Sequence, residues 1–178
     1  MKTLKATACT VAAVILSVMF LNGTAFAQQK LTDPEIASIA VTANQVDIDQ
    51  AAVAKAKSKN PEVIHFAQTM TDDHKAVIAQ AVALATKLKV TPKDNAVSQK
   101  LKADAAKTIA SLKTKSGKAF DKAYVDNEVA YHKAVIRVVE GTLIPQTSNA
   151  ELKALLQKVV PTLKTHLEHA EMVQKSFK

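Results

Sequence analysis

The chain has 178 residues, with 24 lysines and arginines against 16 acidic residues, which gives a formal net charge of +8. It contains no tryptophan, three glycines and one cysteine, Cys9. A disulfide framework, a c-type haem motif and a cysteine-ligated cluster are therefore excluded, and no glycine-rich phosphate loop is present. The abundance of Ala, Val, Leu and Lys is typical of a helical bundle with a closely packed interior.

The first 27 residues have the pattern of a secretory signal peptide. Lys2 and Lys5 form a positive region, an uncharged apolar run follows at 11–21, and Ala25-Phe26-Ala27 matches the small-residue pattern of a cleavage site. An uncleaved membrane anchor is the alternative, but the run is shorter than the roughly 20 residues that span a bilayer. We expect cleavage after Ala27, a periplasmic or secreted protein without a transmembrane segment, and a single domain at 28–178.

The rest of the chain predicts five helices. Apolar residues recur every three or four positions almost throughout, and no strand-like alternation persists. Proline, glycine and capping residues divide the chain into helices at 33–58, 60–89, 95–114, 118–140 and 148–176. The fourth is expected to end at Gly141. Ser148 and Glu151 form a capping box for the fifth, which Pro161 is expected to bend.

These helices predict an all-α, ferritin-like four-helix bundle. The very short turn after the first helix makes the first two helices antiparallel neighbours, and the fourth and fifth form a second hairpin. The third helix then carries the chain from one hairpin to the other. The expected fold is thus two antiparallel hairpins with an additional helix in the crossover.

Two copies of the string HKAVI, at 74–78 and 132–136, place histidines in similar helical settings. His74 and His132 each lie on an apolar stripe that faces the bundle interior, and His166 lies on a similar stripe of the last helix. Three helices therefore direct one imidazole each toward the interior. His65 is rotated to the far side of its helix. His169 is expected to face water, and the alternative is that it joins a site at the rim.

Two interpretations of the three histidines remain open. Buried together, they either stay neutral in a hydrogen-bonded cluster or hold a metal ion, and neutral imidazole suits zinc, copper and iron. Glu128 is the best-placed carboxylate ligand, and Asp73 is expected to orient a liganding histidine rather than to contact the ion. Met70 offers a thioether, although methionine at this spacing usually fills a core.

The same residues argue against a conventional enzyme. Di-iron proteins of this fold use Glu-x-x-His pairs, whereas Glu128 and His132 are four residues apart and Met70 occupies the equivalent position before His74. No Gly-x-Ser-x-Gly nucleophile elbow is present. Adjacent acids such as Asp72 and Asp73 diverge on a helix rather than converge on a substrate. We therefore expect binding rather than turnover, with hydrolytic or redox catalysis at the cluster as a weaker alternative.

A lysine-rich segment at 93–122 carries eight lysines and three aspartates. A solvated helix face explains it most simply, while attraction to anionic lipid headgroups or other envelope polyanions is the alternative. Nucleic acid is a poor partner, because Arg137 is the single arginine and aromatic residues do not accompany the lysines.

Several motifs in order resemble an exported bacterial family. These are the stretches 66–74, 116–124 and 160–167, together with His132. They are similar to the domain of unknown function number four-one-four-two, whose members are ferritin-like bundles often labelled outer membrane proteins. The resemblance covers about 33–172. By position, the residues of the family pattern correspond to Asp73, His74, His132 and His166 in this sequence.

That resemblance also implies an acidic residue on the first helix. The family has a glutamate near the position of Gln45, where Asp47 is the neighbouring acid, and a methionine at the position of Glu128. The resulting prediction is a periplasmic bundle that binds a transition metal for sequestration, delivery or sensing. The alternative is a non-catalytic structural or interaction protein of the envelope, with a purely structural histidine cluster.

Overall fold

The computed structural model describes residues 30–177. The predicted signal peptide, its cleavage site after Ala27 and Cys9 lie outside the described residues. Within 30–177 the chain is helical and contains no strand. No helix in this part is both long enough and apolar enough to cross a membrane.

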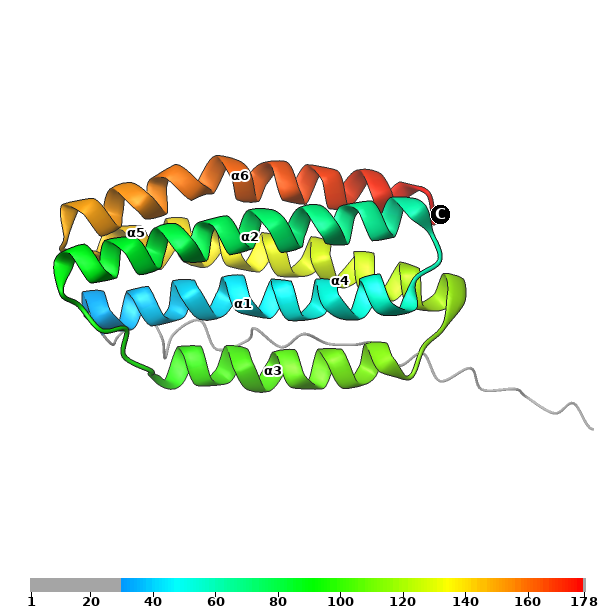
Figure 1. Ribbon diagram of the computed structural model, residues 1–178, viewed down its shortest axis with the longest axis horizontal. Helices are drawn as coiled ribbons and strands as arrows, with labels where there is room; N and C mark the ends of the chain where they lie inside the picture. The colour runs from blue at the N-terminus through cyan, green and yellow to red at the C-terminus, as the bar shows by residue number, and fades with distance from the viewer. Residues whose placement is uncertain (1–29, 178) are drawn as a thin grey trace, which may run out of the picture.

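Five long helices and one irregular segment make up the described chain (Figure 1). The long helices are α1 (Asp33–Lys57), α2 (Pro61–Leu88), α3 (Ala96–Lys113), α4 (Gly117–Val138) and α6 (Ala150–Lys175). A π-helical turn, η1 (Val139–Leu143), and one short turn, α5 (Ile144–Gln146), prolong α4. Figure 1 shows α6 bowed along its length, in agreement with the bend expected from Pro161, which lies inside this helix.

The helix starts follow the capping chemistry of the sequence. Thr32 and Glu35 form a capping box before α1, and the Asn60 side chain accepts from the backbone N–H of Glu62 before α2. Asn95 caps α3 in the same way. Gly117 begins α4 with φ of +52°, a left-handed conformation that glycine adopts without steric cost. Side-chain oxygens thus satisfy backbone donors that a helix start leaves free.

The predicted architecture is confirmed. Helices α1 and α2 form one antiparallel hairpin, α4 and α6 form the other, and α3 runs along α1 as the crossover (Figure 1). The start of α3 is tied to α1, because the Lys93 N–H donates to the Pro34 carbonyl and the Ser38 hydroxyl donates to Asp94. This connectivity is that of a ferritin-like four-helix bundle.

The fourth and fifth helices differ from the sequence prediction at their junction. The helical path does not end at Gly141, which has no left-handed φ and lies inside the π-helical turn. Ser148 is not the cap of the last helix either. The backbone N–H groups of Ser148 and Asn149 donate to the Asp33 carboxylate, and the Asn149 side chain accepts from the first turn of α6. Contact with the start of α1 therefore moves the cap by one residue.

The bundle interior has two apolar clusters separated by a polar layer. One cluster surrounds Phe66, Phe120 and Tyr124 near the turn between α1 and α2. The other surrounds Ile39 and Leu156 at the opposite end. A cavity of about 1980 Å³, lined mostly by aliphatic side chains, opens in this second half and extends to the polar layer. The polar layer contains the predicted histidines.

Candidate metal centre

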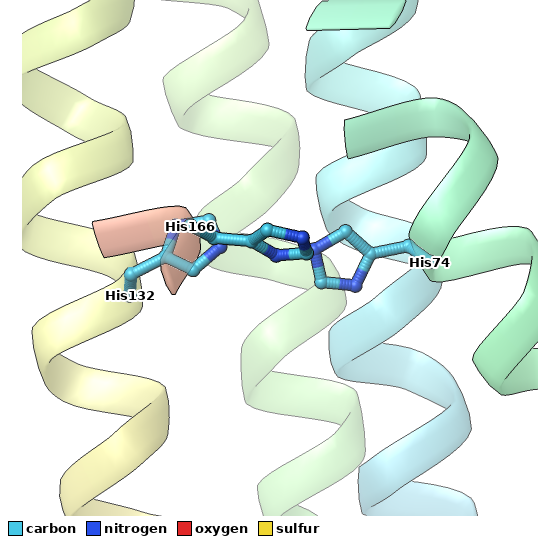
Figure 2. A group of neighbouring side chains, drawn as sticks. All are labelled: His74, His132 and His166. Atoms are coloured by element: carbon cyan, nitrogen blue, oxygen red, sulfur yellow. The ribbon is translucent and has the colours of Figure 1, made fainter. Parts of the chain in front are cut away.

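The three predicted histidines meet in the centre of the bundle. His74 comes from α2, His132 from α4 and His166 from α6, and their rings point toward one another (Figure 2). The ring centroids are 5.1 to 5.8 Å apart, and each residue is at most 3% exposed. One nitrogen from each ring lies within 4.8 Å of the other two. The fold therefore brings the three histidine rings together, as the sequence predicted.

The outer nitrogen of His74 has a partner that fixes its tautomer. Its Nδ1 lies 2.7 Å from the Asn44 side-chain oxygen. The Asn44 amide group donates to the Ala40 carbonyl, so the oxygen is the atom that faces the ring. Because that oxygen only accepts, His74 Nδ1 carries the proton and donates it. His74 Nε2 is then unprotonated, and its lone pair points inward.

His132 and His166 are oriented in the same manner. His132 Nδ1 lies 3.0 Å from the Glu128 carbonyl and donates to it. His166 Nε2 lies 2.9 Å from the Asp73 carboxylate and donates to it. The unprotonated nitrogens are consequently His132 Nε2 and His166 Nδ1. Together with His74 Nε2, these are the three buried ring nitrogens that have no hydrogen-bond partner.

Asp47 on α1 completes the cluster from the fourth side. Its Oδ2 lies 3.3 Å from His74 Nε2 and 3.5 Å from His132 Nε2. The residue is fully buried, and neither carboxylate oxygen has a hydrogen-bond partner. The residues alone did not predict Asp47, and only the family resemblance pointed to it. One signal was available: Asp47 falls at helical spacing within the row of buried residues that includes Ile36, Ile39 and Ala54.

Burial controls the charges of this cluster. Desolvation raises the pKa of Asp47 to about 8. It lowers the pKa of His74 to about 2, with further contributions from His132 and His166. It also lowers the pKa of His132 to about 4. With no cation bound, the site at neutral pH therefore contains the neutral imidazoles of His74 and His132 next to the protonated carboxyl group of Asp47.

Glu128, predicted as a ligand, does not join the group of three inward nitrogens. It is fully buried on α4, and its Oε2 lies 3.6 Å from His132 Nδ1, on the outer side of that ring. It forms a second group with Asp47 and His132, in which ligand atoms lie within 4.8 Å of one another. Both of its carboxylate oxygens lack hydrogen-bond partners. Burial, then Asp47, raises the pKa of Glu128 well above its usual value.

The remaining predicted residues occupy different positions. Asp73 contacts His166 from the surface, with 47% of its side chain exposed. Met70 is packed in the apolar cluster around Phe66. His65 and His169 lie outside the central cluster and contact each other on the surface of α2 and α6.

The large cavity extends to the histidine layer. Its lining includes His74, His132 and His166, together with aliphatic side chains of all five long helices. The inner face of the second half of α2 is only partly buried at Val77, Leu84 and Leu88. The imidazole layer is therefore the boundary between a tightly packed half of the bundle and an open half.

The lysine-rich surface is partly neutralised. On α3, Asp104 pairs with Lys100 and Lys107, and Lys102 pairs with Asp94 just before the helix. These exposed ion pairs reduce the positive potential of the lysine-rich surface, which the sequence indicated as a candidate binding surface for polyanions.

The fold and the buried cluster define an all-α bundle whose interior histidines and carboxylates could hold a metal ion. The chain belongs to the family of the domain of unknown function (DUF4142), whose model matches residues 21–173, which confirms the resemblance seen in the sequence. No curated protein matches this chain. A solved structure of similar fold is CopM in the Cu(II)-bound form, with a TM-score of 0.62 and 14% identity over 84% of this chain and all of that chain.

Proposed function

We propose that this protein binds one divalent transition-metal ion in the centre of the bundle. The ligands are His74 Nε2, His132 Nε2, His166 Nδ1 and Asp47 Oδ2. The observation that carries the proposal is the set of three inward, unprotonated nitrogens without hydrogen-bond partners. Three imidazoles and one carboxylate, supplied by four helices, suit zinc, copper(II) and iron(II).

A purely structural histidine cluster explains these atoms less well. In such a cluster the single proton of the Asp47 carboxyl group can be donated to only one inward nitrogen, and the other two find no donor because the outer nitrogens hold the ring protons. Each buried polar atom without a partner costs about 1–3 kcal/mol. A bound cation satisfies all four ligand atoms at once, and the hydrogen bonds from the outer nitrogens hold the rings in place for it.

Charge balance favours a divalent ion. When Asp47 and Glu128 are both ionised, they contribute two negative charges to a site that is otherwise neutral. A divalent cation cancels them, whereas a monovalent ion leaves a net negative charge and a trivalent ion a net positive one. Uncompensated charge at this depth is strongly unfavourable. Glu128 therefore contributes by neutralising the ion rather than by binding it.

The binding role fits sequestration, delivery or sensing in the periplasm. The predicted signal peptide supports export. Copper(II) is the first ion to test, because CopM, which has a similar fold, was solved with Cu(II) bound. That ion belongs to CopM and does not identify the metal of this chain.

Equilibrium dialysis against Cu²⁺, Zn²⁺ and Fe²⁺ tests the proposal. Protein purified without added metal should take up one tightly bound equivalent, and the triple variant His74→Ala/His132→Ala/His166→Ala should take up none at this site. Met70→Leu is the matched control, because it alters a buried residue beside the layer without removing a proposed ligand. Equal uptake by the wild type and the triple variant would remove the proposal.

A further inference from the structure

A second pair of histidines lies on the surface near the proposed centre. His65 on α2 is exposed, and His169 on α6 is half-buried. Their ring centroids are 6.3 Å apart, and the His169 ring also packs edge-on against Phe66 with centroids 5.1 Å apart. His169 is one helical turn from His166. Two helices thus bring two imidazoles together at the seam that leads to the interior cluster.

We propose that His65 and His169 form a surface site that captures a divalent transition-metal ion and supplies it to the central site. The delivery step rests on the proposed function, whereas capture at the surface stands independently. Neither residue contributes to the central ligand set, and neither forms an ion pair within residues 30–177.

The ring geometry suits a shared ion. Metal–nitrogen bonds of about 2.0–2.1 Å place the centroids of two coordinated imidazoles roughly 5–6.5 Å apart. The observed separation falls in this range, so a small side-chain rotation brings both rings to one ion. Packing against Phe66 limits the motion of His169. Burial, then His65 and His166, lowers the pKa of His169, which keeps this ring neutral and able to bind a metal.

Two protein ligands make a weaker site than four. Water would complete the coordination at the surface, so the ion would exchange readily, as delivery requires. Met172, which is 61% exposed, lies one turn beyond His169 and offers a thioether on the same helix. A soft ligand at this position would favour copper over zinc.

Asp73 connects the surface to the centre. It lies two turns from His65 on α2, and its half-exposed carboxylate accepts from the buried His166. The carboxylate is thus accessible to solvent and also contacts a ring whose other nitrogen faces the central site.

Calorimetric titration of the full chain with Cu²⁺, and separately with Zn²⁺, distinguishes the two sites. We expect one tight and one weaker equivalent for the wild type. His65→Ala/His169→Ala should lose the weaker equivalent, retain the tight one, and load the tight site at least about fivefold more slowly at limiting metal. Lys75→Ala/Gln157→Ala, which alters two exposed residues on the same helices, is the matched control and should behave as the wild type.

The outcomes separate this inference from the proposed function. Loss of the tight equivalent in the triple central variant, with the weaker one retained, supports both. A weaker equivalent that persists in His65→Ala/His169→Ala overturns the surface site. Unchanged loading kinetics in that variant overturn the delivery step. A surface equivalent without any tight one overturns the central site and delivery, while capture stands.

Discussion

The side-chain oxygen of Asn44 lies 2.7 Å from His74 Nδ1 and thereby determines which nitrogen of His74 faces Asp47. Helix α1 thus supplies both a proposed ligand and the group that orients another one. Such orienting partners typically change metal affinity by 10- to 100-fold when they are removed.

Replacing Asn44 should weaken metal binding without unfolding the bundle. In Asn44→Leu the acceptor for the His74 proton is lost, so the ring is free to rotate or change tautomer. We expect affinity for Cu²⁺ or Zn²⁺ to fall roughly 10- to 100-fold, with circular dichroism unchanged. Asn44→Asp keeps an acceptor and should retain more of the affinity. Equal affinities of Asn44→Leu and the wild type would contradict this role.

Asp47→Asn should separate stability from metal binding. In the metal-free protein the amide replaces a buried carboxyl group of similar size that is protonated at neutral pH, so the melting temperature should not decrease. With metal present, the variant lacks the anionic ligand, and we expect a loss of affinity of roughly 100-fold, or about 2.7 kcal/mol. Thermal melts with and without Zn²⁺ measure both effects. A large destabilisation without metal would show that Asp47 is a structural residue.

Glu128→Gln should weaken binding without changing the ligand set. The substitution removes one of two negative charges that balance a divalent ion, and the fully buried side chain keeps its size. We expect roughly tenfold lower affinity, about 1.4 kcal/mol, and an unchanged number of nitrogen ligands by X-ray absorption spectroscopy. A changed ligand number would instead make Glu128 a direct ligand.

The pH dependence of the metal-free protein follows from the buried groups. Between pH 6.5 and 8 the unfolded chain has already lost the carboxyl protons that the folded state retains on Asp47, whose pKa is about 8, and on Glu128, whose pKa is also raised by burial. Stability should therefore fall as the pH rises from 6.5 to 8, by up to about 1.4 kcal/mol per pH unit for each group.

Between pH 4.5 and 6.5 the histidines oppose this trend. The unfolded chain binds protons that folded His74 and His132 do not, because their pKa values are about 2 and about 4. The two contributions cancel, so the unfolding free energy should be nearly flat there and fall again below pH 4. Urea denaturation from pH 4 to 8 checks this curve. A stability that rises steadily to pH 8 without metal would contradict it.

Asp104 should limit binding to anionic membranes. It pairs with Lys100 and Lys107 on the exposed face of α3. Asp104→Asn frees both lysines, and each lysine near an anionic surface contributes about 1 kcal/mol. Co-sedimentation with phosphatidylserine vesicles at low salt should therefore increase severalfold, and it should disappear at high salt. Vesicle binding that does not change with salt concentration would contradict an electrostatic interaction with the membrane.

The spacing of apolar residues, together with the proline, glycine and capping residues at the helix ends, was sufficient to predict the fold and the convergence of His74, His132 and His166. Five separated apolar stripes, short turns and repeated helix starts leave few alternatives to two hairpins with a crossover. The junction after α4 was not predictable in the same way, because contact with Asp33 across the bundle overrides the local preference of Ser148 for a cap.

The contact of Asp47 with the inward nitrogens was also beyond sequence reasoning. Glu128 shares a helical face with His132, so spacing on one helix favoured it. Asp47 reaches the inward nitrogens from a different helix, and that relation depends on how α1 packs against α2 and α4. Spacing within one helix gives directions around its axis but not the offset between two helices.

The position of the imidazole layer affects how an ion can leave. On one side, the side chains of Phe66, Phe120 and Tyr124 are fully buried in one apolar cluster, so we expect local opening of the backbone there to be rare. On the other side, the second half of α2 borders open space and can shift outward without disturbing that aromatic half. The tightly packed end of the bundle thus holds the imidazole rings in place, while the helix ends at the open side can move.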